Sequence, residues 1–456
     1  MTPQAEMNPI LLKPSTDASS QVVVLGRVWA ELTAADYHQS RVEELFPIVR
    51  RAYHELAANH DLMVLEGAGS PAEINLKSRD IVNMRMACEA NAACVLVGDI
   101  DRGGVFAALL GTLELLDAQE RAMIRGFIIN KFRGDVELLR PGIRMIEEQI
   151  GIPCVGVVPY LPEPGLEEED SVALEHRRSV SRAWPVKEHA DESPRRQLRI
   201  GVIALPYLSN FTDFDVLAAE PSVALAFIEN PSDVSGADML ILPGTKQTLD
   251  DLDWIRTRGF ADAIIEFPGS IAGICGGMQM LGLEIADPTG TENRGVARKA
   301  TGLALLPIST ILNPGKITKR VRGCVTAPSM PLCAAGAVFD GYEIHLGETI
   351  YADAAVPFAA IQRAGENGDW PDGAVSADGR VFGTYVHGIF DNDSFRHSVL
   401  AALRQIRDLA PARRFEFVTE ERERRIDRLA DHVRRSLNLE LIRSWVAAPA
   451  AREAAR

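Results

Sequence analysis

The stretch "IAGICGGMQMLG", residues 271–282, places one cysteine between an apolar run and a helical pattern. The run 271–274 is typical of a buried strand, and Met278 and Leu281 fall at helical spacing after Cys275. A sharp strand-to-helix turn exposes the side chain at its apex, and glycine neighbours let backbone N–H groups approach a substrate carbonyl. The positive end of the helix that follows would favour the thiolate form. The stretch therefore predicts an α/β fold with Cys275 as a nucleophile.

A nucleophilic cysteine needs a base, and the sequence offers one downstream. In "FGTYVHGIFD", residues 382–391, His387 lies near the end of another strand-like run. A late histidine at a strand end is what an α/β nucleophile site requires. For a lone cysteine the alternative is a buried structural thiol in a tight turn. The pairing of Cys275 with His387 favours the nucleophile.

Short apolar runs alternate with amphipathic stretches along most of the chain, which predicts two doubly wound α/β domains with mainly parallel sheets. In the first half we expect strands in "QVVVLG", "LMVLEG", "ACVLVGD", "GFIIN" and "CVGVVPY", and helices over 40–58, 80–91, 104–116 and 135–150. The polar segment 166–197 reads as a linker. The predicted parts are a first domain over 1–165, the linker, a second domain over 198–400 and a helical extension over 401–456.

Composition excludes several classes of function for the 456-residue chain. The formal net charge of −15 disfavours a nucleic-acid surface, which needs clustered Lys and Arg. There is no run of about 18 apolar residues and no signal-peptide pattern at the start, so we expect a cytoplasmic protein that does not bind membranes. The six cysteines lack CxxC spacing, which argues against a disulfide framework and a zinc site.

Polar side chains follow three expected strand ends in the first domain. Glu66 stands before a Gly-Ala-Gly turn, and Asp99 and Asp101 are two residues apart. Asn130 and Lys131 end a third strand. Such groups suit a nucleotide or a substrate carboxylate, with a carboxylate also able to meet a metal–phosphate group. The alternative is ordinary turn and N-cap chemistry, but acidic ends on one parallel sheet favour a site.

The second half resembles the class I glutamine amidotransferases. "GICGGMQMLG" is similar to their G-x-C-x-G-x-Q-x-L-G stretch, and "LPGT" resembles the turn that completes their oxyanion hole. The resemblance implies that Cys275 attacks the glutamine amide while backbone N–H groups near Gly244 and Gly276 hold the oxyanion. It also places Gly277 and Gln279 at the glutamine pocket.

Two further features of the sequence concern the same pocket. In "GYEIHLGET", periodicity alone favours a half-buried strand with Glu343 and His345 on a polar outer face. However, "YEIH-x-G" resembles the amidotransferases of corrinoid synthesis near the glutamine pocket, which makes Tyr342 and His345 secondary candidates. Most class members carry His-x-Glu, whereas Ile389 stands two residues after His387. We therefore expect the third triad member to be absent and glutaminase turnover to be slow.

The order "MNPILLKP", "EGAGSPAEINL", "VGDIDRGGV", "INKFRGD", "GVVP", "GICGGMQMLG" and "YVHGIF" resembles the cobyric acid synthases of cobalamin (vitamin B12) biosynthesis across almost the whole chain. The resemblance implies a first domain like dethiobiotin synthetase that uses ATP and Mg2+, with Glu66 as a metal candidate and no tightly bound organic cofactor. The implied substrates are glutamine, ATP and adenosylcobyrinic acid a,c-diamide, which is amidated at its b, d, e and g carboxylates to give adenosylcobyric acid.

One expected motif is missing. The sequence contains no G-x-x-x-x-G-K-[ST], the loop whose backbone N–H groups and lysine cradle a triphosphate. We therefore expect a P-loop-type domain that is incomplete at its N-terminus, which puts the ATP step in doubt. Two alternatives stay open: the related synthase that amidates the a and c carboxylates, and a glutaminase-only or non-catalytic protein.

Overall fold

A computed structural model describes residues 4–16, 19–33, 42–162, 184, 197–293, 295–328, 330–333, 335–412 and 414–447. The chain divides into two compact units. One contains residues 1–165 and 425–456, and the other contains residues 166–424. Most of the expected linker, 166–197, lies outside the described residues.

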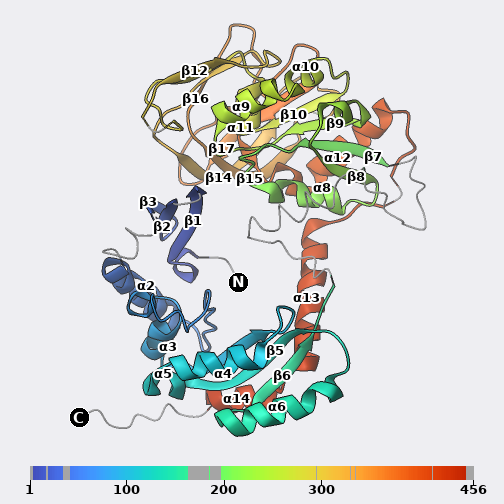
Figure 1. The fold of residues 1–456 in the computed structure, drawn as a ribbon. Helices are drawn as coiled ribbons and strands as arrows, with labels where there is room; N and C mark the ends of the chain where they lie inside the picture. The colour runs from blue at the N-terminus through green and yellow to red at the C-terminus, as the bar shows by residue number, and fades with distance from the viewer. Residues whose placement is uncertain are drawn as a thin grey trace. The chain divides into compact units, whose positions relative to one another are not determined.

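The larger unit is built on a six-stranded sheet in the order β19-β20-β10-β9-β7-β8 (Figure 1). All neighbours pair in parallel except β19 and β20, which are antiparallel. Every residue of β8, β9, β10 and β20 is buried, as expected for a sheet covered on both faces. The strands are β7 (Leu198–Ile203), β8 (Val223–Ile228), β9 (Met239–Leu242), β10 (Ser270–Ile274), β19 (Ala374–Val375) and β20 (Val381–Thr384).

Short helices connect these strands. The helices are α8 (Asp215–Ala219), α9 (Thr248–Thr257), α10 (Phe260–Ile265), α11 (Gly276–Leu281) and α12 (Asp393–Ile406), with 3-10 turns η5 (Phe211–Phe214), η6 (Pro231–Gly236) and η7 (Ile389–Asp391). Helix α11 follows β10 directly after Cys275, as the opening stretch predicted. The strand-to-helix turn is therefore embedded in the centre of the parallel sheet.

Two smaller sheets complete this unit. One has the order β12-β11-β13-β16 and the other β18-β17-β14-β15-β21. Their strands are β11 (Glu284–Asp287), β12 (Arg298–Thr301), β13 (Ile308–Ile311), β14 (Ile317–Val325), β15 (Val338–His345), β16 (Glu348–Tyr351), β17 (Ala359–Arg363), β18 (Trp370–Asp372) and β21 (Val386–His387). The antiparallel pairing of β15 with β21 sets Tyr342 opposite His387.

The smaller unit contains a three-stranded parallel sheet in the order β4-β5-β6. Its strands are β4 (Cys94–Asp99), β5 (Ile124–Phe132) and β6 (Cys154–Pro159), and its helices are α2 (Val42–Ala57), α3 (Met84–Ala90), α4 (Val105–Leu115), α5 (Ala118–Met123), α6 (Val136–Ile150), α13 (Val418–Ser436, which begins in the larger unit) and α14 (Leu439–Ala447). Asp117 and Glu120 form a capping box at the start of α5. A bridge from Gly156 to Leu437 joins β6 to the end of α13.

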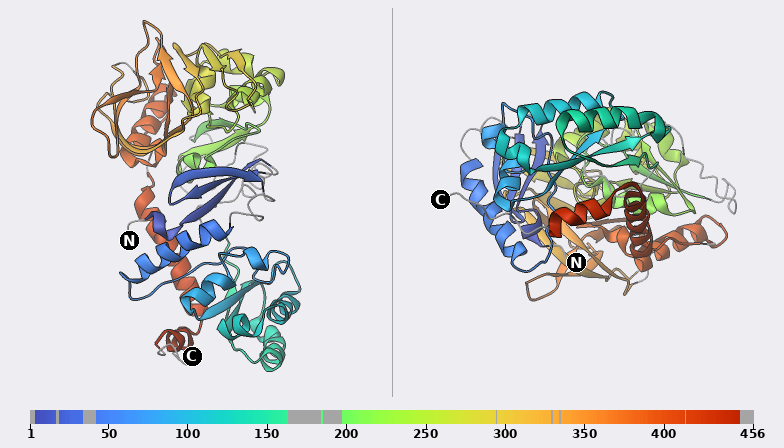
Figure 2. Two further views of the ribbon diagram at one scale, coloured as in Figure 1. Left: turned by 90° about the vertical axis from the view of Figure 1, so that its left-hand side faces the viewer. Right: turned by 90° about the horizontal axis from the view of Figure 1, so that it is seen from below.

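The strand predicted in "QVVVLG" exists, but it belongs to an antiparallel hairpin sheet, not to the parallel sheet. The order is β1-β2-β3, with β1 (Ile10–Thr16), β2 (Ser19–Val24) and β3 (Arg27–Thr33), preceded by η1 (Ala5–Met7). Leu25 and Gly26 both have positive φ and make the two-residue turn that favours a hairpin. In Figure 2 these strands, in blue, form a ribbon separate from β4–β6.

The strand predicted in "LMVLEG" is wrong. Residues 62–67 form no strand, and the 3-10 turn η3 (Lys77–Arg79) is the next regular element. Val64 is 86% exposed and Leu62 58% exposed, so these apolar side chains are not packed in a sheet. An apolar run becomes a strand only when another strand takes up its backbone hydrogen bonds, and among the described residues none pairs with this run.

No helix in the described parts of the chain is long and apolar enough to cross a membrane.

Candidate active site

Cys275 stands at the apex of the turn between β10 and α11. Its backbone has φ 51° and ψ −112°, an uncommon conformation for a residue with a side chain. The N–H of Cys275 donates to the Thr384 carbonyl at 2.8 Å, which continues the pairing with β20. The Sγ atom donates to the Ile344 carbonyl at 3.3 Å. Strained backbone of this kind is typical of nucleophiles aimed out of a turn.

The glycines around Cys275 allow α11 to lie against the end of β9. A methyl group at Gly277 would overlap the backbone of Leu242, and one at Gly276 would press on the Thr245 side chain. Gly244 lies beside the base, because a methyl group there would be 3.0 Å from the His387 ring. The two turns that were expected to supply oxyanion N–H groups therefore lie next to each other.

His387 has a carboxylate partner, so the expectation that its orienting acid is absent is wrong. Nδ1 of His387 lies 2.6 Å from Oδ2 of Asp213, and the other oxygen of Asp213 accepts the Gly388 N–H at 3.0 Å. Both side chains are buried. Asp213 lies in η5, after β7, and comes 174 residues before His387. Asp213 thus supplies a carboxylate to His387 although Ile389 stands two residues after it.

The charge of Asp213 governs the ionisation of the base. Burial alone would lower the pKa of His387, but the charge and hydrogen bond of Asp213, with the adjoining Cys275 thiol, outweigh burial and raise the pKa to about 10. The imidazole is therefore protonated at neutral pH when it faces both groups. With Nδ1 bonded to Asp213, Nε2 is the ring nitrogen that remains for the hydrogen bond with Cys275.

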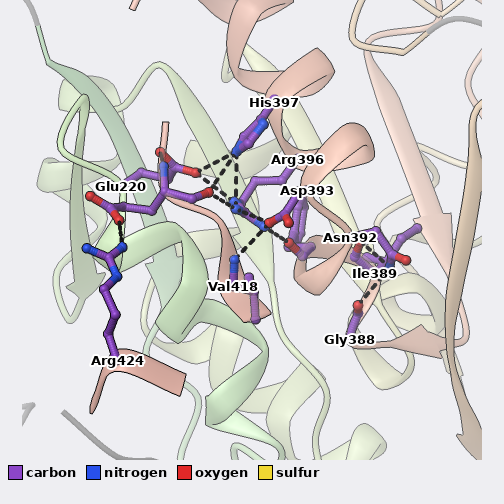
Figure 3. Close-up of polar contacts among 11 residues, drawn as sticks. Glu220, Gly388, Ile389, Asn392, Asp393, Arg396, His397, Val418 and Arg424 are labelled. Carbon is purple, nitrogen blue, oxygen red and sulfur yellow. Dashed lines mark hydrogen bonds and ion pairs between the residues drawn. The ribbon is translucent and has the colours of Figure 1, made fainter. Parts of the chain in front are cut away.

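The chain after His387 is held by a buried arginine. Figure 3 shows Arg396 between Glu220 and Asp393, with the nitrogen–oxygen distance 2.7 Å in both pairs. Asn392 donates to the carbonyls of Gly388 and Ile389 at 3.2 and 3.1 Å. These bonds fix the turn that follows the base.

Gln279, predicted at the glutamine pocket, is buried and bonded to protein groups through its whole amide. Its Nε2 donates to the Leu346 carbonyl at 3.0 Å and to the Tyr385 hydroxyl at 3.2 Å. Its Oε1 accepts from the Thr248 hydroxyl at 3.3 Å. The amide therefore ties α11 to the end of β15 and to the start of α9.

Glu343 and His345 share a face of β15, but that face points inward, so the predicted polar outer face is wrong. Glu343 is 2% exposed and receives two hydrogen bonds from Arg363, at 2.6 and 2.7 Å. Burial would raise the pKa of Glu343, but His345 and Arg363 overcome it and lower the pKa to about 2. The ring of His345 lies 3.0 Å from Glu343 and stacks on Tyr385 at 3.7 Å.

Tyr342 points the other way, and its side chain is 46% exposed. It lines a hollow of about 980 Å3 that also borders Gly388, next to the base. Arg320 lies over the Tyr342 ring at 5.6 Å. The hollow therefore borders the turn after His387, whereas Cys275 and His387 themselves do not line it.

In the smaller unit, four of the predicted residues gather at the ends of β4 and β5. Asp99 pairs with Asn130 in the sheet, and Lys131 Nζ donates to Asp99 at 2.8 Å. This bond from Lys131 lowers the pKa of Asp99. Asp101 receives Arg133 Nε at 3.3 Å. Lys131 has φ 61°, which marks a constrained backbone at the strand end.

Glu66 is not brought into this group by any contact in the described part of the chain. It is exposed, in the stretch that forms no strand. The carboxylates of Asp99 and Asp101 are already engaged by cationic side chains, and no three His, Cys, Asp or Glu side chains among the described residues gather as metal ligands. The residues present therefore do not form a prebuilt Mg2+ site, although Mg2+ often binds through one or two carboxylates and substrate phosphates.

Comparisons with known proteins agree with this geometry. Residues 199–395 match the model of the CobB/CobQ-like glutamine amidotransferase domain, and residues 10–167 match an AAA domain. The chain is 47% identical over 446 residues to a cobyric acid synthase of Moorella thermoacetica, covering 96% of this chain and 83% of that protein. Cobyric acid synthases of Chloroflexus aurantiacus and Sorangium cellulosum are 45% and 46% identical, covering 96% and 97% of this chain and 84% and 85% of theirs. The chain therefore belongs to the cobyric acid synthase family.

Proposed function

We propose that the protein amidates the b, d, e and g carboxylates of adenosylcobyrinic acid a,c-diamide, with ATP and glutamine as cosubstrates, and so makes adenosylcobyric acid. Membership of the cobyric acid synthase family supports this reaction. The single observation that best supports glutamine hydrolysis by this chain is that His387 contacts both Asp213 and Cys275. A buried base with its own carboxylate is suited to repeated proton transfer.

The glutaminase half proceeds through a thioester. The Cys275 sulfur attacks the side-chain amide carbon of glutamine, and N–H groups near Gly244 and Gly276 hold the oxyanion that forms. His387 carries the thiol proton and gives it to the leaving nitrogen, so the C–N bond breaks and ammonia departs. Water, deprotonated by His387, then attacks the thioester and returns glutamate and the free thiol.

The amidation reaction first converts the oxygen of a substrate carboxylate, a poor leaving group, into a phosphate, which leaves readily. ATP transfers its terminal phosphoryl group to a substrate carboxylate, and ammonia displaces phosphate from the acyl phosphate to leave the amide. Mg2+ that accompanies ATP would offset negative charge on the phosphates. The strand-end group of Asp99, Asp101, Asn130 and Lys131 is the part of this chain that we assign to nucleotide or substrate binding.

The experiment separates the two halves by nitrogen source. Wild-type protein and Cys275→Ser are given ATP, the corrinoid diamide and either glutamine or ammonium, and amide formation is measured by mass spectrometry. We expect Cys275→Ser to lose glutamine-dependent amidation and keep ammonium-dependent amidation. Loss of both would contradict the role given to Cys275. Glutamine hydrolysis without any ATP-dependent amidation by the wild type would support the glutaminase-only alternative.

A further inference from the structure

A glutamate from a distant loop binds the start of α9. Glu292 lies between β11 and β12, and its Oε2 accepts the Thr248 N–H at 2.7 Å and the Leu249 N–H at 3.4 Å. Its Oε1 lies 3.0 Å from the Thr248 hydroxyl. Free N–H groups at a helix start are satisfied by such an acceptor. The cap comes from 44 residues away, so it also ties the loop of Glu292 to α9.

The Thr248 hydroxyl is shared between two acceptors. It lies 3.0 Å from Oε1 of Glu292 and 3.3 Å from Oε1 of Gln279. The orientation of the Gln279 amide is fixed, because its Nε2 must donate to the Leu346 carbonyl. Among the described residues, no other group donates to Oε1 of Gln279. A hydroxyl carries one proton, so Thr248 can satisfy Glu292 or Gln279 but not both.

The protonation of Glu292 decides which acceptor is satisfied. An ionised carboxylate forms the stronger hydrogen bond and takes the Thr248 proton, which leaves Gln279 Oε1 without a donor. A neutral carboxyl donates its own proton to the Thr248 oxygen, and Thr248 then donates to Gln279. In both states Oε2 of Glu292 still accepts the two backbone N–H groups.

The surroundings of Glu292 keep a substantial share of it neutral around pH 7. Burial, with Asp287 close by, raises the pKa of Glu292 to about 7. Asp287 binds the backbone N–H of Glu292 itself, at 2.9 Å. Charged groups on the neighbouring elements are themselves paired. Arg298 of β12 bonds to Asp250 and Asp253 of α9. Asp251 of α9 accepts from the Thr245 hydroxyl, and Lys299 of β12 pairs with Glu284 of β11. Neutral Glu292 is thus compatible with a site that works at physiological pH.

We propose that Glu292 is a positioning residue for the glutaminase reaction, and that its neutral form, acting through Thr248, holds Gln279 and the Cys275 turn in the working arrangement. Gln279 lies four residues after the nucleophile and bonds to Leu346, two residues beyond the carbonyl that accepts from the Cys275 thiol. Release of its oxygen loosens α11 against the start of α9. This inference rests on the proposed glutaminase function.

The test compares pH profiles. kcat/KM for glutamate release from glutamine is measured on the full chain, from about pH 5.5 to about pH 9, for the wild type and Glu292→Gln. The amide of the variant donates to Thr248 at every pH. We expect the ratio of wild type to variant to fall roughly fivefold as the pH rises past neutrality, the loss that one hydrogen bond causes. Ionisation of Cys275 and His387 cancels in this ratio.

Two further variants complete the test. Glu284→Gln, which removes a partly exposed carboxylate of β11, should give a flat ratio to the wild type. Thr248→Val lacks the hydroxyl that responds to Glu292. The ratio of its kcat/KM to that of Glu292→Gln should therefore not change with pH, and should stay at the low value that the wild type reaches above neutrality. The proposal would be overturned if the ratio of wild type to Glu292→Gln did not change with pH. It would also be overturned if Thr248→Val showed the same fall in that ratio as the wild type.

A second measurement separates this inference from the proposed function. The unfolding free energies of the wild type and Glu292→Gln are compared over the same pH range. We expect their difference to change through neutrality, and a constant difference would contradict a titrating Glu292. A wild type that releases no glutamate at any pH would refute the glutaminase function, while the unfolding data would still judge the ionisation of Glu292.

Discussion

The contact between Asp213 and His387 gives the sharpest prediction. In Asp213→Asn the shape is kept, but the charge that raises the pKa of His387 to about 10 is removed. The asparagine amide can also turn its NH2 group toward Nδ1, which would move the ring proton to Nε2 and leave no acceptor for the thiol proton. We expect kcat for glutamine hydrolysis to fall on the order of 10²- to 10⁴-fold, the range that a lost triad acid produces.

The same change alters stability with a defined sign. The pKa of His387 is raised from 6.5 to about 10, so its contribution is fully present below pH 6.5 and is lost as the pH rises through 10. A shift of about 3.5 pH units corresponds to about 5 kcal/mol, which is an upper limit because the burial cost of Asp213 is removed as well. Urea unfolding of wild type and Asp213→Asn should therefore differ by several kcal/mol, on the order of 2 to 4, near pH 7 and by less near pH 10.

The control is Asp262→Asn, which removes an exposed carboxylate on α10 of the same unit. Glutamine hydrolysis by this variant should match the wild type. The reasoning would be refuted if Asp213→Asn kept kcat within about threefold of the wild type, since the Asp213 carboxylate would then contribute little to catalysis. Equal stability differences at pH 7 and pH 10 would show that His387 does not titrate against Asp213.

Three other changes test separate parts of the structure. Gly277→Ala should cost about 2 to 4 kcal/mol in urea unfolding, because its methyl group overlaps the Leu242 backbone, whereas Gly315→Ala, with open space around it, should cost less than about 1 kcal/mol. Glu343→Gln should lose stability at neutral pH, and its deficit against the wild type should shrink as the pH falls from 4.5 through about 2, where Glu343 becomes protonated. Lys131→Met should reduce ATP-dependent amidation from ammonium by at least about tenfold and leave glutamine hydrolysis intact, as two separate assays would report.

The strand-to-helix turn at Cys275 and the strand end at His387 could be predicted because each has a local signature, while their catalytic roles stay predictions. A glycine-bounded thiol between a strand and a helix can be recognised within the twelve residues from Ile271 to Gly282. Asp213 has no comparable signature, since it lies in the short 3-10 turn η5, 174 residues before His387, and only the fold brings the two together. Its one hint is its position soon after the end of β7, where polar residues meet the other strand ends.

Periodicity also failed where a distant partner decides the outcome. Alternation in β15 showed that Glu343 and His345 share a face, but it could not show which face is buried. Arg363 of β17 neutralises Glu343 and makes the charged face the inner one. The strand predicted over residues 62–67 is wrong for a related reason, because an apolar run forms a strand only if a neighbouring strand pairs with it.

Glu292, which is partly buried, and Glu343, which is buried, ionise over different pH ranges because their neighbours differ. Glu343 faces Arg363 and stays ionised, with a pKa of about 2. Glu292 is partly buried near Asp287, the donors to its oxygens among the described residues are the Thr248 hydroxyl and two backbone N–H groups, and its pKa is about 7. A group that is always charged can organise a site but cannot respond to pH, whereas a group that titrates near neutrality can. Of these two, Glu292 is therefore the one whose proton can set how firmly the helix after Cys275 is held.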